Sequence, residues 1–201
     1  MTPWEERSDL LATVWGTLTD PGTLYRTVEK NGPTARAVVY GVLLGMIGLI
    51  LGIAWQLVGT GLLDVTGLRS RPEVVAELGS VGPTLLITVL VITSPFFLTL
   101  SLYASAGIYH LALSLLGGAR YGYDATLRAT AYAQTAQLAS VIPICGGLIA
   151  PIWVFVLIVV GLREVHETTT GRAVGAIVLP LVACCGLLAL AIVIPLYLAS
   201  R

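Results

Sequence analysis

The sequence predicts an all-α integral membrane protein, a bundle of about five transmembrane helices with short interfacial helices at its N-terminus. Of the 201 residues, 56% are hydrophobic and only 11% are charged, against about 25% charged in an ordinary soluble domain. The charged residues also leave four long uncharged windows, at 37–63, 78–119, 129–162 and 173–200. A helix needs about 20 apolar residues to cross the bilayer core, so each window can hold a span.

The N-terminal region, residues 1–34, is predicted to be cytoplasmic and amphipathic, and residues 35–201 are predicted to form the transmembrane domain. Apolar side chains recur at helical spacing in the N-terminal region, at Leu11, Val14, Trp15 and Leu18. Asp20-Pro21 begins a second short helix, because proline fits the first helical position, and Asn31-Gly32-Pro33 ends it. These two helices either lie at the membrane interface or pack on loops of the bundle.

The first window predicts one tilted span with a glycine face. Its glycines form two Gly-x-x-x-Gly pairs on one side of the helix: Gly41, Gly45, Gly48 and Gly52. Glycine lets helix backbones approach closely in lipid. This face therefore packs either on another helix of the same chain or on a second copy of the protein.

The second window predicts one long, bent helix from about Pro83 to Leu116, since Pro95 kinks a membrane helix without reversing the chain. The alternative is a hairpin. With a single crossing, one side receives eight basic residues and the other side three: Arg7, Arg26, Lys30, Arg36, Arg120, Arg128, Arg163 and Arg172 against Arg69, Arg71 and Arg201. A hairpin would divide them five against six. The positive-inside rule favours the single crossing, with the N-terminus cytoplasmic and the C-terminus extracytoplasmic.

The third window divides at Ile142-Pro143 and Gly146-Gly147, which break a helix. We predict a helix from Asp124, as its N-cap, to about Ser140, and another from about Leu148 to Leu162. The first carries four polar side chains: Thr130, Gln134, Thr135 and Gln137. It is therefore a full span, a buried helix or a re-entrant one. The last window predicts a single span.

One histidine falls inside an uncharged window. His110 lies near the cytoplasmic end of the second window, and such groups in the membrane often mark function. With Gln134 and Gln137 it forms a candidate intramembrane polar site. Its role is either a structural hydrogen bond to these amides or to backbone, or an ion or proton relay, or metal binding.

A second group of candidates is brought together by topology at the cytoplasmic face: Arg128, Arg163, Glu164, His166 and Arg172. These residues either form ion pairs that join loops or contact anionic lipid headgroups or a partner protein.

Several function classes are disfavoured. No hydrolase, metalloprotease or phosphate-loop motif occurs, and the uncharged windows offer no embedded acid to a proton-coupled pump or aspartyl protease. The three cysteines have no zinc-type spacing. We therefore expect a protein that is not an enzyme, with no catalytic, cofactor or metal residues. The net charge of zero argues against a nucleic-acid partner.

Short motifs follow one another in order along the chain. They are Trp15-x-x-Leu18-x-Asp20-Pro21-x-x-Leu24-Tyr25, Gly117-Gly118, Thr126-Leu127-Arg128, Ala131-Tyr132-Ala133, Ile142-Pro143, Gly146-Gly147, Ile152-Trp153, Gly161-Leu162-Arg163-Glu164-Val165-His166, Thr170-Gly171-Arg172 and Leu179-Pro180. In order and spacing this series resembles prokaryotic members of the Yip1-domain family over roughly residues 10–200. The resemblance implies five membrane helices and a cytoplasmic N-terminus. Eukaryotic members are associated with vesicle trafficking and Rab-type GTPases, but their trafficking-linked cytoplasmic sequences are not apparent in this short tail, so a Rab partner is not carried over.

These features favour a non-enzymatic scaffold or adaptor in the plasma membrane of a prokaryote. Its expected partners are the lipid bilayer, anionic lipids, and a second copy or another membrane protein. The alternative is an ion or small-solute channel or transporter, which proline and glycine breaks within spans and polar side chains in the long helix would suit.

Overall fold

A computed structural model describes residues 5–6, 9–65, 81–143 and 145–199. The described elements are all helical: α2 (Leu10–Thr19), α3 (Pro21–Thr27), α4 (Ala35–Val65), α6 (Val81–Leu115), α7 (Tyr123–Ala133), the 3₁₀ helix η1 (Gln134–Val141), α8 (Gly146–Val165) and α9 (Thr170–Ala199). Four of them are long and apolar enough to cross a membrane, over residues 35–59, 84–115, 146–165 and 170–190. The all-α membrane bundle is therefore confirmed.

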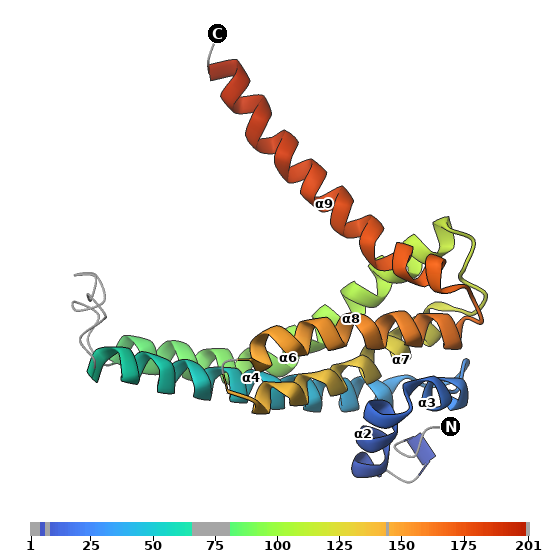
Figure 1. Cartoon of the computed structure of the whole chain (residues 1–201), viewed down its shortest axis with the longest axis horizontal. Coiled ribbons are helices and arrows are strands. Elements are labelled where there is room, and N and C mark those ends of the chain that lie inside the picture. Colours follow the sequence, from blue (N-terminus) through green and yellow to red (C-terminus); the bar gives the residue numbers. More distant parts are fainter. Residues whose placement is uncertain (1–4, 7–8, 66–80, 144, 200–201) are drawn as a thin grey trace.

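The second window forms one continuous helix, as predicted. Pro95 lies inside α6, and the Thr99 hydroxyl donates to the Pro95 carbonyl oxygen at 2.7 Å. Figure 1 shows α6 beside α4 at first and then turning away towards the start of α9. The helix ends where Gly117 takes a positive φ of 66°, with the Gly118 N–H donating to the carbonyl of Leu113 at 2.9 Å. This is the glycine-ended turn that satisfies the last carbonyls of a helix.

The segment from Asp124 to Ser140 differs from the prediction of one helix capped by Asp124. The N-cap is Gly122, and Asp124 lies in the first turn of α7. From Gln134 the chain tightens into η1, so the fifth segment is a broken, partly polar pair of helices. Pro143 holds the residue before it, Ile142, extended, and this ends η1. Every residue of α7 from Ala125 to Ala133 is buried. Of the three alternatives for this segment, α7 is therefore a buried helix.

The core lies where α7 and η1 run between α4 and α8. Its largest apolar members include Tyr40 and Leu44 of α4, Tyr132 of α7, and Leu157 of α8. Alanine at every fourth position of α7 lets α8 approach closely, and Gly161 lies where an added Cβ would be 3.1 Å from the Ala129 Cβ. The N-terminal region shares this core, because the fully buried Tyr25 of α3 belongs to it and its hydroxyl donates to the Ala129 carbonyl at 3.3 Å.

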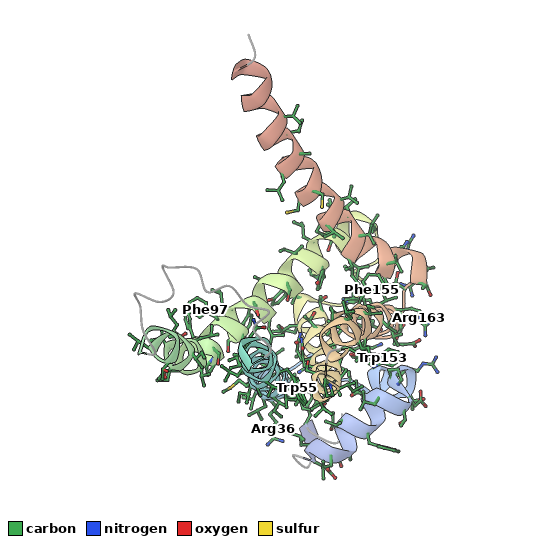
Figure 2. The ribbon with its side chains drawn as sticks, turned by 60° about the vertical axis from the view of Figure 1, so that its left-hand side comes forward. Arg36, Trp55, Phe97, Trp153, Phe155 and Arg163 are labelled. Carbon is green, nitrogen blue, oxygen red and sulfur yellow. The ribbon has the colours of Figure 1, made fainter. Side chains whose placement is uncertain are left out.

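The outer surface of the bundle is apolar, as a lipid-facing surface must be. Side chains project outward around the helices in Figure 2, among them Phe97 of α6 and Phe155 of α8. The last helix packs on α6 and α8 near its start, and its far half stands clear of the bundle in Figure 1.

Candidate functional site

A buried arginine fixes the N-terminal segment to the bundle. Arg128 of α7 is fully buried, and its Nε lies 3.1 Å from Oε1 of Glu5. Its terminal nitrogens donate to the backbone carbonyls of Glu29 at 2.6 Å and Pro33 at 3.0 Å. The guanidinium carries five donors in a rigid fork, so one side chain holds three points of the chain before the first span.

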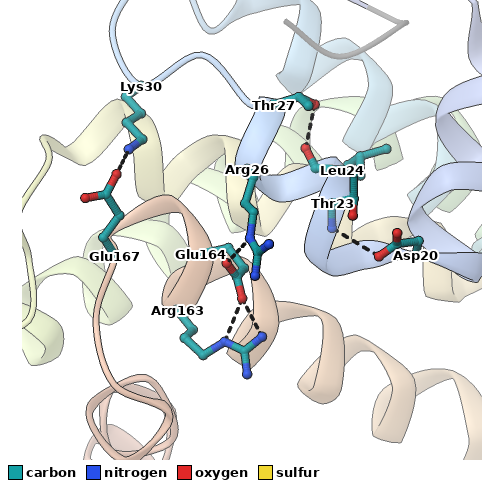
Figure 3. Close-up of polar contacts among 9 residues, drawn as sticks. All are labelled: Asp20, Thr23, Leu24, Arg26, Thr27, Lys30, Arg163, Glu164 and Glu167. Atoms are coloured by element: carbon teal, nitrogen blue, oxygen red, sulfur yellow. Dashed lines mark hydrogen bonds and ion pairs between the residues drawn. The ribbon is translucent and has the colours of Figure 1, made fainter.

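Ion pairs also join α3 and the segment after it to the end of α8 and the turn that follows (Figure 3). Arg26 of α3 donates through Nε to Oε2 of Glu164 at 2.8 Å, and Lys30 pairs with Glu167. The hydrogen bond from Lys30 lowers the pKa of the Glu167 carboxyl, and the same bond raises the pKa of Lys30. Water screens such exposed pairs, so they position α3 on the end of α8 and stabilise the fold only weakly.

A hydrogen-bonded chain joins α6, α7 and the turn after α8. The backbone N–H of Tyr121 donates to Nδ1 of His166 at 3.2 Å, so the ring proton of His166 is on Nε2. That Nε2 lies 2.8 Å from the Thr126 hydroxyl, which lies 2.9 Å from Nδ1 of His110. The two contacts of Thr126 are consistent when His166 donates to the Thr126 hydroxyl and Thr126 donates to Nδ1 of His110. Burial of the His166 ring lowers its pKa to about 4, so the ring is neutral at pH 7.

The five residues predicted at the cytoplasmic face do gather at one end of the bundle, but they are not equally exposed. Arg128 and His166 are fully buried, which corrects the expectation that they face lipid headgroups or a partner. The two terminal nitrogens of Arg128 and both ring nitrogens of His166 are instead hydrogen-bonded within the chain. Glu164 pairs with both Arg26 and the half-buried Arg163. Of the predicted group, Arg172 is the exposed member, and it donates to the Gly117 carbonyl at 3.1 Å.

The predicted intramembrane group of His110, Gln134 and Gln137 is divided. His110 bonds to Thr126 near the end of α6, whereas both glutamines lie in or at the start of η1 and line a groove with α4. The physical reason is distance along α7, since Gln134 is eight residues beyond Thr126 and a helix rises about 1.5 Å per residue. The structure gives His110 a hydroxyl partner that the sequence did not single out.

The glycine face of α4 contacts other parts of the same chain. A Cβ added at Gly41 would lie 3.0 Å from Cα of Ala131, and one at Gly48 would lie 2.8 Å from Cβ of Gln137. At Gly45 the neighbour is Leu98 of α6, at 3.3 Å. A Cβ at Gly52 would meet no neighbouring atom of the described residues within 4 Å. Three of these glycines thus lie against α6, α7 and η1, and the fourth opens into the groove.

The groove has a volume of about 600 Å³. It is lined by Gly45, Gly48, Leu49, Gly52, Ile53 and Gln56 of α4, Leu98 of α6, and Gln134 and Gln137 of η1. Three carboxamides therefore face a space bounded otherwise by glycine and aliphatic side chains.

The apolar face of α2 points away from the bundle. Leu11 and Trp15 are 77% and 70% exposed, and Leu18 is 39% exposed, whereas Thr13 and Thr17 are fully buried. The two threonine hydroxyls donate to backbone carbonyls of their own helix at 2.9 and 2.7 Å, so the helix packs inward without an unsatisfied hydroxyl.

Comparison with known protein families identifies the family of this chain. A family model described as the Yip1 domain matches residues 15–193. The chain belongs to the Yip1 domain family. No curated protein and no solved structure matches it.

The Yip1 domain includes Arg128, the His110–Thr126–His166 chain and the whole groove, while Glu5 and Leu11 precede it. Within the part of the chain that the structure describes, no three His, Cys, Asp or Glu side chains are placed to hold a metal ion. Sequence reasoning missed Glu5, Thr126 and Gln56. One sequence feature could have pointed to Thr126. It is a hydroxyl side chain among alanines, in a segment whose polar residues argue against a simple membrane span.

Proposed function

We propose that this Yip1 domain protein is a non-enzymatic scaffold or adaptor. Its bundle holds the N-terminal helices α2 and α3, here called the N-terminal platform, in one leaflet of the membrane. The observation that carries the proposal is the exposed apolar face of α2 on a segment that is fixed to the bundle. Buried Arg128 of α7 holds this segment through Glu5, Glu29 and Pro33, so the position of α2 relative to the bundle is fixed.

The depth of α2 supports a place at the membrane interface. Thr17 lies near the hydroxyl of Tyr40, and Tyr40 lies five residues after the start of α4, or about 8 Å along the helix axis. Figure 1 shows α2 turned across the direction of α4. Leu11 and Trp15 then face the boundary between headgroups and acyl chains, where a tryptophan ring is favoured.

The proposed orientation is N-terminus in the cytoplasm and C-terminus outside, in the plasma membrane of a prokaryote. Its support is the distribution of basic residues, eight against three. Several of these, Arg7, Arg69, Arg71 and Arg201, lie outside the described residues. A reporter that is active only in the cytoplasm should work when fused to the N-terminus and fail at the C-terminus. The reverse pattern would overturn the orientation.

The scaffold function is tested with the full chain in its native membrane. Replacing Leu11, Trp15 and Leu18 together by serine should remove most proteins captured by proximity labelling, while the chain still inserts. Ala12→Ser with Thr19→Ser is the matched control on exposed positions of the same helix and should leave the captured set unchanged. An unchanged set in the triple variant contradicts the proposal. Deleting residues 1–30 is a poorer test, because it strips buried Arg128 of partners.

A second candidate function is a small-solute or ion pathway, favoured by the carboxamide-lined groove beside a broken helix. Purified protein in liposomes would then pass ions or small solutes above background, and Gln137→Leu would reduce that flux. Flux equal to that of empty liposomes removes this candidate and leaves the scaffold proposal intact.

A further inference from the structure

The groove between α4, α6 and η1 lies at membrane depth. Its first lining residue on α4, Gly45, is ten residues from the start of the helix, and its last, Gln56, is 21 residues from it. At a rise of about 1.5 Å per residue, the groove extends from about 15 to about 31 Å along the span. It therefore lies mostly in the half of the span away from the N-terminal platform, where its neighbours are lipid tails and the opposite headgroup region.

The polar atoms in the groove have no partner within the described structure. None of the carboxamides of Gln56, Gln134 and Gln137 hydrogen-bonds to another described residue. A polar group taken out of water without a hydrogen bond is unfavourable. Gln137 lies against Gly48 of α4, where an added Cβ would be 3.0 Å from Oε1 of Gln137.

The lining also limits the charge of an occupant. None of its nine residues is ionisable, so a phosphate or ammonium group here would be desolvated without a counter-ion. A carboxamide both donates and accepts hydrogen bonds, and it matches a hydroxyl together with ester carbonyls. Leu49, Ile53 and Leu98 offer an aliphatic wall, and the open space over Gly52 admits a chain lying close to α4.

We propose that this groove binds a neutral glycerolipid of the diacylglycerol class. Its hydroxyl and ester carbonyls hydrogen-bond to Gln134 and Gln137, and one acyl chain lies along α4 between Gly45 and Gly52. The site is independent of the N-terminal platform and of the scaffold function. Its volume of about 600 Å³ falls within the range of small-molecule binding pockets and takes the glycerol region with part of one chain.

The test uses the full-length protein in vesicles that contain a diacylglycerol with a photoactivatable group in its acyl chain. The comparison probe is phosphatidylglycerol with the same group in the same chain. After illumination, labelled peptides are identified by mass spectrometry. We expect diacylglycerol to label residues 45–56 and 134–137 at least fivefold more than phosphatidylglycerol does. Equal labelling by both probes would mean that the groove does not select a neutral head, and would overturn the proposal.

Two variants locate the binding. Gly52→Leu fills the groove from an open position. Gly59→Leu is its matched control, because among the described residues a Cβ at Gly59 also meets no neighbour within 4 Å, and Gly59 does not line the groove. Labelling should fall about fivefold or more in the first and stay unchanged in the second. Gln134→Leu with Gln137→Leu removes the hydrogen bonds and keeps the space filled, and should lower labelling by a factor of about five or more.

The remaining outcomes are also decisive. Labelling that persists in both Gly52→Leu and the double glutamine variant would overturn the proposal. So would a crosslink from position 52 to a second copy of the chain in place of lipid, since the groove would then be an interface between copies. If Gly52→Leu lowers the unfolding temperature, the double glutamine variant decides the result alone. None of these results bears on the capture of partner proteins by α2.

Discussion

At the scale of single residues, the end of the bundle is organised by buried polar groups with specific partners. Arg128 and His166 are both fully buried, and each is hydrogen-bonded to backbone from another segment. Burying such groups is unfavourable unless their partners are in place. They therefore specify one arrangement of the N-terminal segment, α7 and the turn after α8.

Removing the charged side chain of Arg128 should destabilise the protein strongly. Arg128→Met removes an ion pair from the Glu5 carboxylate and one donor from each of two carbonyls, so we expect the free energy of unfolding to fall by about 3 kcal/mol. Denaturant unfolding in detergent micelles measures it. Arg172→Met, at an exposed arginine with one hydrogen bond, is the control and should change stability by less than about 1 kcal/mol. Adding Glu5→Gln to Arg128→Met should recover part of the loss. Equal losses of stability in Arg128→Met and Arg172→Met would show that Arg128 does not hold the N-terminal segment in place.

The His166 ring should make stability depend on pH. Its pKa is lowered to about 4, first by burial and then by the nearby His110 and Lys30, from an ordinary value of 6.5. The unfolded chain thus binds this proton at a higher pH than the folded chain. The free energy of unfolding should then fall as pH drops from about 6.5 to about 4, by up to about 3 kcal/mol, and be unaffected by this ring above that window. His166→Gln should flatten the difference between pH 7 and pH 4, whereas an equally steep dependence in the variant would assign it to other groups.

At the scale of elements, the packing of α4 depends on which glycine faces which neighbour. Gly41 and Gly52 belong to one stripe, yet only at Gly41 would a Cβ approach backbone, the Cα of Ala131 at 3.0 Å. The shift from α-helix to η1 at Gln134 is a second element-scale feature, because it leaves both glutamines of η1 facing the groove.

Two alanine substitutions should separate these glycines. Gly41→Ala forces α7 away from α4, and overpacking of this kind destabilises by about 1–3 kcal/mol. Gly52→Ala adds a methyl group in open space and should be neutral, or stabilising by up to about 1 kcal/mol, since alanine is the better helix former. Thermal unfolding in the same detergent compares the two. Similar effects at both positions would contradict the packing described for α4.

At the scale of the whole molecule, contacts of long sequence separation bring the platform and four helix ends to one end of the bundle. Arg26 and Glu164, which form an ion pair, are 138 residues apart in the sequence. This places the start of α4, the end of α6, the end of α8 and the start of α9 together.

Labelling of single cysteines should report this shared end. With Cys145, Cys184 and Cys185 replaced by alanine, we expect Thr23→Cys and Thr169→Cys to react with a membrane-impermeant maleimide from the same side of sealed vesicles. Both positions are exposed. Gly59→Cys, at the opposite end of the first candidate span, should react only from the other side. Reaction of Thr23→Cys and Thr169→Cys from opposite sides would rule out the fold.

The sequence by itself determined the class of protein, the single helix through Pro95 and the break at Pro143, because hydropathy and backbone restrictions are local properties of a short stretch of chain. It also carried the family, through motifs in a fixed order. Only the tertiary structure decided that Arg128 and His166 are buried, that His110 bonds to Thr126, and that Gln134 and Gln137 face a groove with Gly52. Each of these depends on which helices lie side by side. Hydrogen bonds and close packing act over a few ångströms between residues far apart in the chain, and no periodicity within one segment encodes that pairing.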